Sequence, residues 1–368
     1  MKTRQRFLIL FLAAVLLSAC ASPSTPAVPT VVVVPTAAAT QTLSAPSELT
    51  VMTHDSFAVT DTLVKQFESD NNAKITFVKG GDAGAALNKA ILSKNSPSAD
   101  VFYGVDNTFL SRSLDEGIFE PYASPALGNV EDAYKLDPTN QALPVDYGDV
   151  CVNYDKDYFK TKGLTVPETL EDLAKPDYKN LLVVESPATS STGLAFLLAT
   201  IAHFGPDKYL DYWKQLKDNG AVAVDGWEAA YYTNFSGSSG KGPQPLVVSY
   251  ATSPAAEVVF AKTPPSDSPT ASVVGPQSCF RQVEFVGILK GTKQRKLAEK
   301  FVDFMLSKSF QEDMPLQMFV YPVVKGAALP EAFTKYAQVP AQPATLAPAE
   351  IAKNRDAWIK AWNDTVLK

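Results

Sequence analysis

Several acidic residues follow apolar segments in the first third of the sequence, where strands of a sheet would end. His54 and Asp55 follow the first such segment, Asp82 stands in the glycine-rich turn after the second, and Asp106 follows the third. Open parallel sheets bind ligands at the carboxyl ends of their strands. The pattern therefore indicates an acidic ligand site at one sheet edge, although Asp at such positions also caps helices and forms turns.

A segment rich in hydroxyl groups, Ser186–Gly193, precedes an apolar helical pattern that begins near Leu194. Ser190 and Ser191 lie at the expected start of that helix. Free backbone N–H groups and the helix dipole favour a phosphate or carboxylate at such a place. Two interpretations remain open: an oxyanion-binding site, or ordinary capping of the helix by one hydroxyl.

Aromatic residues gather in three later segments, which are 226–232, 249–254 and 319–322. They include Trp227, Tyr250 and Phe319, and they suit the walls of a site for a flat or cationic ligand. An aromatic face near a cation contributes about 0.5–2 kcal/mol. Packing in the core is the competing interpretation for each of these rings.

The elements that position these residues alternate between strand and helix. This alternation predicts an α/β protein with two lobes, mainly parallel sheets, chain crossovers at a hinge and a ligand cleft between the lobes. The expected strands are 49–53, 75–78, 101–104, 150–154, 181–184, 221–224, 246–249 and 282–289, and the expected helices are 60–70, 84–93, 109–116, 193–204 and 209–219.

The first residues have the features of an export signal. A basic start precedes an apolar stretch at 7–17 and the sequence Leu-Ser-Ala-Cys, which ends at Cys20. The stretch is shorter than the roughly 20 residues that span a bilayer. We predict a signal peptide at 1–19, lipidation of Cys20 and an uncharged tether rich in Pro, Ala and Thr at 20–47. An uncleaved signal anchor or an ordinary cleavage site is the alternative.

The remaining chain is long enough for two lobes of ordinary domain size. We expect the first lobe to comprise 48–148 and 283–330, the second to comprise 149–282, and a helical segment at 331–368 to pack on both. The formal net charge is −6, and loss of the basic signal makes it more negative. Without a basic patch, nucleic acid and anionic lipid are not expected partners.

If Cys20 carries lipid, Cys151 and Cys279 are left as an even pair. Disulfides persist outside the cytoplasm, and we predict that the two cysteines are bonded. Two buried free thiols are the alternative, since sequence alone does not bring their Cα atoms within about 7 Å.

Seven distinctive strings follow one another in the chain: THDSF, ADVFYGVDN, PVDYGDVCVNYD, SPATSSTGLAFLLA, GWEAAYY, VVSYATSPA and QMFVYPV. In these strings and in their order, the chain resembles the thiamine-binding lipoproteins and periplasmic proteins of ABC importers over 48–368. The resemblance implies a two-lobed type II binding-protein fold and capture of thiamine or its phosphates. Delivery to a membrane permease is implied as well.

The resemblance also implies roles for individual residues. Asp82 matches an acid that engages the aminopyrimidine, and Trp227 and Tyr250 match aromatic residues of the cleft. Ser190 and Ser191 match the hydroxyl site for the alcohol or phosphate end of the ligand.

The chain departs from the family at three positions of the expected site. His54 and Phe319 stand where larger Tyr and Trp rings are expected, and Ala256 replaces another Tyr. A smaller aromatic wall would admit thiamine phosphates or a pyrimidine precursor, and the sequence does not rank these ligands.

The expected protein is therefore a monomeric receptor outside the cytoplasm that is held to the membrane only by its lipid. It performs no catalysis and needs no cofactor or structural metal. Two alternatives share the fold: a ferric-iron receptor that uses Tyr231 and Tyr232 with His54 and Asp55, and a thiaminase-like enzyme with Cys151 as nucleophile.

Overall fold

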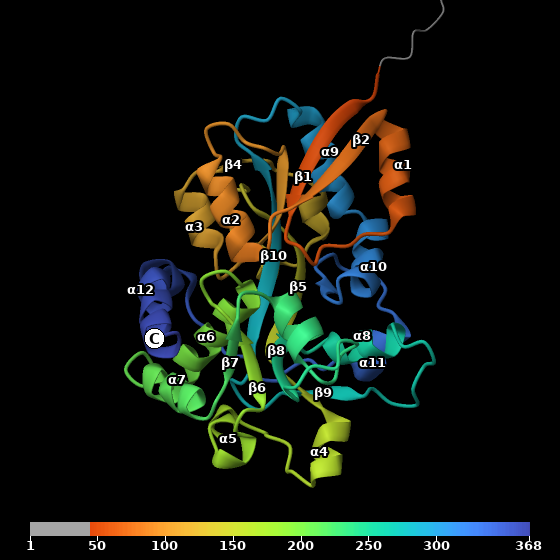
Figure 1. Ribbon diagram of the computed structural model, residues 1–368. Coiled ribbons are helices and arrows are strands. Elements are labelled where there is room, and N and C mark those ends of the chain that lie inside the picture. The colour runs from red at the N-terminus through yellow and green to blue at the C-terminus, as the bar shows by residue number, and fades with distance from the viewer. Residues whose placement is uncertain (1–44) are drawn as a thin grey trace, which may run out of the picture. The chain divides into compact units, whose positions relative to one another are not determined.

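A computed structural model describes residues 45–368 (Figure 1). The predicted signal peptide, the lipidation of Cys20 and the tether up to residue 44 lie outside the described residues. The first strand begins at Ser47, the last residue of the expected tether. Within 45–368, none of the helices has the length and apolar character needed to cross a membrane.

All eleven strands of residues 45–368 belong to one sheet. Its main order is β2-β1-β3-β10-β5-β8-β6-β7, with β9 and β11 paired to β5 and β4 paired to β10. The strands are β1 (Ser47–Thr53), β2 (Ala73–Lys79), β3 (Val101–Asp106), β4 (Phe119–Glu120), β5 (Leu143–Asp155), β6 (Leu182–Glu185), β7 (Val222–Val224), β8 (Leu246–Tyr250), β9 (Thr270–Val273), β10 (Phe280–Leu289) and β11 (Tyr321–Pro322).

The sheet is mixed, whereas the sequence predicted mainly parallel pairing. Parallel pairs occur at its two ends, in β2-β1-β3 and in β7-β6-β8. The central strands β5 and β10 run antiparallel to each other and to their neighbours. Both are long and mostly buried, and they join the two ends of the sheet in Figure 1. Local apolar patterns do not encode the direction of such strands.

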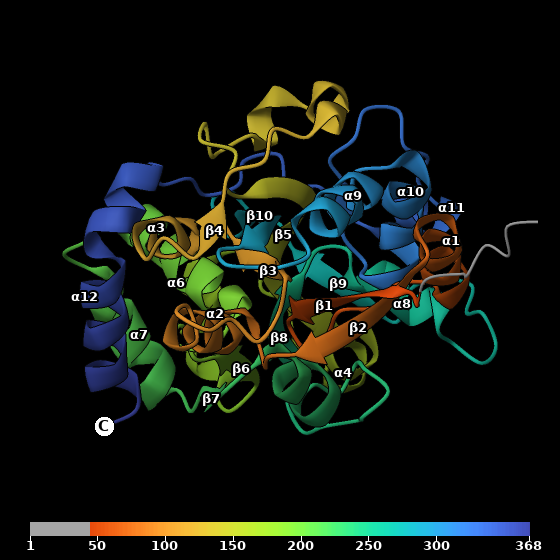
Figure 2. The ribbon, with the colours of Figure 1, turned by 90° about the horizontal axis from the view of Figure 1, so that it is seen from above.

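The helices cover this sheet, as Figure 2 shows from above. Their bounds are α1 (Asp61–Asn71), α2 (Ala83–Leu92), α3 (Leu110–Asp115), α4 (Lys156–Lys162), α5 (Leu170–Leu173), α6 (Ser191–Phe204), α7 (Tyr209–Asp218), α8 (Ser253–Val259), α9 (Arg295–Met305), α10 (Lys308–Gln317), α11 (Glu331–Tyr336) and α12 (Pro348–Val366). The five helices expected with bounds are confirmed within about two residues, as α1, α2, α3, α6 and α7.

The long helix α12 packs against helices from distant parts of the sequence. Trp362 meets Trp213 of α7 edge-on, with ring centroids 5.4 Å apart. The helix α12 also contacts α3, where the Arg355 guanidinium donates a hydrogen bond to the Ser111 hydroxyl. Trp362 and Trp213 are almost fully buried, so α12 is part of the core.

Cys151 and Cys279 form the predicted disulfide. Their Cα atoms are 4.3 Å apart and the bond closes 128 residues of chain. Cys151 lies in β5, and Cys279 directly precedes β10. The bond therefore ties together the two central strands of the sheet. Both sulfurs are buried, in contact with Ala251.

Candidate functional site

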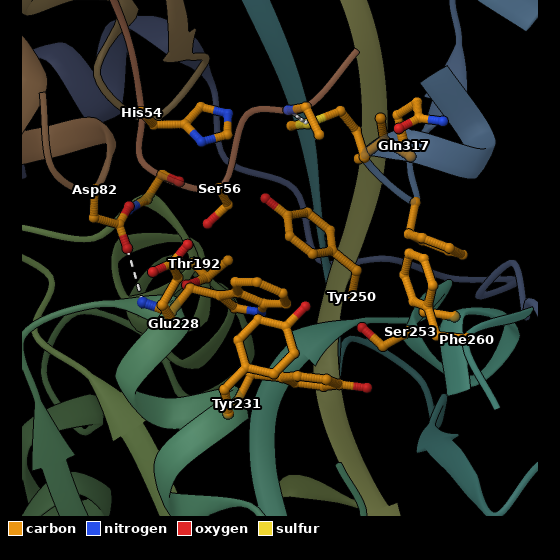
Figure 3. A pocket seen from close by; sticks show the side chains of 18 of the residues that line it. His54, Ser56, Asp82, Thr192, Glu228, Tyr231, Tyr250, Ser253, Phe260 and Gln317 are labelled. Carbon is orange, nitrogen blue, oxygen red and sulfur yellow. Dashed lines mark hydrogen bonds between the residues drawn. The ribbon is translucent and has the colours of Figure 1, made fainter. Parts of the chain in front are cut away.

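A cavity of about 300 Å³ is lined by the residue after β1, by β8 and β10, by the residue that caps α2 and by the start of α6. Figure 3 shows His54 on one side of this cavity and Tyr231 on the opposite side, with Tyr250 between them and Asp82 at one end. The volume is at the lower end of the range for small-molecule sites. Its walls are aromatic and acidic.

Asp82 links segments that are far apart in the sequence. It caps α2 by accepting a hydrogen bond from the Ala83 N–H at 2.6 Å. Its other oxygen accepts from the Trp227 N–H at 2.8 Å, and a longer contact of 3.5 Å reaches the Ser191 N–H. Burial raises the pKa of Asp82, while these donors favour its ionised form.

The hydroxyl-rich segment caps α6. The Ser190 hydroxyl accepts from the Gly193 N–H and exchanges a hydrogen bond with Thr192, while Ser190 itself is fully buried. Ser191 and Thr192 line the cavity, and Ser190 lies outside the lining. Glu185 is buried behind this turn, and burial raises its pKa well above the usual range. The Asp82 carboxylate already contacts the Ser191 N–H at the start of this helix, which makes the site less favourable for an anion.

Trp227 and the tyrosines that follow it form one aromatic wall. A π-helical segment, Ala229–Asn234, places Tyr231 parallel to Trp227 with centroids 5.0 Å apart. Tyr232 meets Trp227 edge-on. The Trp227 indole N–H donates to the Ser249 hydroxyl at 2.9 Å, and the Tyr231 hydroxyl donates to Glu257 at 2.8 Å. These bonds hold the rings in a fixed orientation.

Tyr250 and Phe319 form further parts of the wall. A Cβ on Gly148 would lie 2.7 Å from the Tyr250 ring, so this glycine makes room for it. The Tyr250 hydroxyl donates to Gln282, which in turn donates to Asp106. Phe319 has a φ of +54°, which is uncommon for a bulky residue, and its carbonyl accepts from the Thr252 hydroxyl.

His54 and Glu284 face each other at the opposite side of the cavity. His54 Nε2 lies 3.6 Å from Glu284 Oε1, and both residues line the cavity. Burial lowers the pKa of His54 to about 4, so its imidazole is neutral at pH 7. Burial and then the charge of Asp146 raise the pKa of Glu284 well above its usual range.

The structure places most of the expected site residues in this cavity. His54, Asp82, Ser191, Trp227, Tyr250 and Phe319 line it, as does Ala256. Asp55 lies outside the lining, and its carbonyl accepts a hydrogen bond from the Lys79 ammonium. Sequence reasoning missed Glu257 and Glu284. The signal for Glu284 was a single charged residue inside the apolar run 282–289.

The two alternative functions find little support in the geometry. The Tyr231 hydroxyl is engaged by Glu257, and burial raises its pKa well above 10, which disfavours an iron-binding phenolate. Within 45–368, no three His, Cys, Asp or Glu side chains form a metal-binding group. The disulfide holds the Cys151 sulfur, so it is not a free thiolate.

Known proteins resemble this chain over most of its length. The thiamine-binding periplasmic protein of Escherichia coli is 32% identical over 87% of this chain and 94% of its own. A solved periplasmic thiamin binding protein shares 31% identity with a TM-score of 0.76, covering 87% of this chain and 96% of that one. A ferric binding protein from Campylobacter jejuni, at 19% identity and a TM-score of 0.69, covers 86% and 99% and shares the fold alone.

These neighbours confirm the predicted two-lobed α/β fold of type II periplasmic binding proteins. A model of the family described as bacterial extracellular solute-binding protein matches residues 96–344, which is more than half of the chain. The curated relatives at 29–32% identity are binding proteins of the same kind. The chain therefore belongs to the bacterial extracellular solute-binding proteins.

Proposed function

We propose that this protein is a receptor that captures thiamine in the cavity and delivers it to an ABC importer. The observation that carries the proposal is a small cavity whose walls combine stacked aromatic rings with carboxyl groups. Trp227, Tyr250 and Phe319 supply rings, and Asp82, Glu228, Glu257 and Glu284 supply acids. Thiamine has a flat aminopyrimidine and a cationic thiazolium ring, and both suit such walls.

The proposal extends to the division of the chain. The first lobe comprises 48–148 and 283–330, and the second comprises 149–282. The two boundaries, at 148/149 and 282/283, lie within the central strands β5 and β10. Rotation of the lobes about these strands would open and close the cavity.

We further propose that Cys20 carries lipid and that the protein acts as a monomer outside the cytoplasm. The export-like start of the sequence supports this location, and so does membership of an extracellular family. No reaction on the ligand is proposed, because the relatives are binding proteins and Cys151 is held in a disulfide.

The test is isothermal titration calorimetry on the purified protein, which is unfolded and refolded with its disulfide intact to remove bound ligand. Thiamine, its mono- and diphosphate, and the free aminopyrimidine alcohol are titrated in turn. Saturable one-to-one binding of thiamine with no change in the recovered ligand supports the proposal. If none of the four compounds bound and Fe(III) did, the proposed ligand would be iron and not thiamine.

A further inference from the structure

His54 Nε2 is a buried polar atom without a hydrogen-bond partner in the structure. The residue is 8% exposed and lines the cavity. A buried polar group that forms no hydrogen bond is costly, and such a group at a cavity wall can be satisfied by a ligand. Gly104 keeps this position open for the ring, because a Cβ there would lie 2.5 Å from His54 Cδ2.

Glu284 reaches the same part of the cavity from a position in β10 next to an irregular sheet register. In β10 it pairs with Asp106 of β3 and with Asp146 of β5, and the register to β5 shifts directly after it. Such β-bulges redirect side chains beside functional sites. The Tyr103 hydroxyl lies 3.1 Å from Glu284 Oε2 and donates to Asp146 at 2.6 Å. The other oxygen, Oε1, faces His54.

These two residues form a pair with complementary hydrogen-bonding capacity. The neutral imidazole offers either a donor or an acceptor at Nε2, and Glu284 Oε1 offers an acceptor. The two atoms are 3.6 Å apart. An aminopyrimidine presents an amino donor next to a ring-nitrogen acceptor along one edge, so it matches an acceptor beside an imidazole N–H.

Asp82, by contrast, already accepts hydrogen bonds from backbone donors. Its oxygens are within 2.6 Å of the Ala83 nitrogen and 2.8 Å of the Trp227 nitrogen. A ligand amino group would meet an acid that is already engaged. The pair formed by His54 and Glu284 has more free capacity for the ligand.

We propose that His54 and Glu284 recognise the amino and ring-nitrogen edge of the pyrimidine, while Asp82 joins the two sides of the cavity. The inference rests on the proposed function and refines it. Glu284 accepts from the amino group and the His54 N–H donates to the ring nitrogen. The pair therefore selects ligands that carry an amino group beside a ring nitrogen.

The test compares two ligands: thiamine, and the analogue in which a keto oxygen replaces the pyrimidine amino group. The keto form reverses the donor and acceptor on that edge. The variants are His54→Phe, which keeps a flat ring, and Glu284→Met, which removes the acceptor at similar size. Glu284→Gln is the matched control because it keeps an acceptor oxygen. Circular dichroism and thermal melting confirm the fold of each variant.

We expect the refolded protein to bind thiamine about ten-fold more tightly than the keto analogue. His54→Phe and Glu284→Met each lose about ten-fold in thiamine affinity and little in analogue affinity, whereas Glu284→Gln stays within about three-fold of the parent protein. Equal loss for both ligands, or unchanged thiamine affinity in both variants, overturns the inference alone. A parent protein that binds neither ligand overturns the proposed function instead.

Discussion

Replacement of Asp82 tests whether a single carboxylate holds the two sides of the cavity together. Asp82→Asn keeps a good cap on α2, since Asn caps helices about as well as Asp. It removes the charge that strengthens the hydrogen bond from the Trp227 N–H, which spans 145 residues of sequence. A hydrogen bond to a charged group contributes about 1.5–3 kcal/mol, and a neutral one about 1 kcal/mol.

The expected cost of Asp82→Asn is therefore about 1.5 kcal/mol, localised at this contact. This value corresponds to roughly ten-fold faster amide exchange at Trp227 when exchange follows local opening. Asp82→Ala also removes the cap of α2, which lowers the free energy of unfolding by about a further 1 kcal/mol. Weaker thiamine binding is expected for both variants, because a less stable closed state reduces apparent affinity.

The assay is hydrogen exchange of individual amides, followed by NMR in the ligand-free protein. Asp155→Asn is the control, because Asp155 is also a helix-capping carboxylate, which accepts from the Asp157 and Tyr158 N–H groups of α4. The exchange rate of the Trp227 amide should be the same in this control variant as in the parent protein. If the Trp227 amide exchanged as slowly in both Asp82 variants as in the parent protein, the reasoning would be contradicted. Asp82 would then act only as a cap of α2.

Three further outcomes are expected. Trp227→Ala should weaken thiamine binding by about 1–3 kcal/mol through lost stacking, as measured by calorimetry, and unchanged affinity would remove this ring from the site. Replacing Cys151 and Cys279 by Ser should lower the free energy of unfolding in urea by up to about 5 kcal/mol, because the bond closes 128 residues; a loss below about 1 kcal/mol would contradict this account. The melting temperature of the ligand-free protein should fall between pH 5 and pH 8, because burial raises the pKa of Asp106 to about 7 and that of Asp146 to about 6. The folded protein keeps these protons, which the unfolded chain releases above about pH 4, so this stability is lost as the pH rises through about 6 and 7. His54, with its pKa lowered to about 4, offsets one of these protons between about pH 4 and pH 6.5. Asp106→Asn should make the fall in melting temperature shallower, and an equally steep fall in that variant would assign it to other groups.

Much of the fold was readable from local patterns. Strands and helices follow from apolar periodicity, and Ser190 and Asp82 stand at helix starts because short polar side chains satisfy the free N–H groups there. The pairing of Cys151 with Cys279 was predicted from the cysteine count and the expected compartment. These features depend on neighbouring residues or on composition, which a sequence displays directly.

The candidate site was only partly predictable for the same reason. The sequence indicated Trp227, Tyr250 and an acid at Asp82, but it also indicated Asp55, which lies outside the cavity lining. It gave no reason to place Glu284 opposite His54. Positions along one strand are local, whereas the partner across the cavity depends on how distant segments fold together.

Local sequence patterns specify the α/β alternation, the helix caps and the kinds of side chain available for a ligand. Packing between distant segments sets the antiparallel direction of β5 and β10 and brings Glu284 within 3.6 Å of His54. It also brings the Asp82 carboxylate to the backbone of Trp227. The physical reason is that strand direction, register and contacts across a cavity result from packing among residues far apart in the chain, and no short pattern records them.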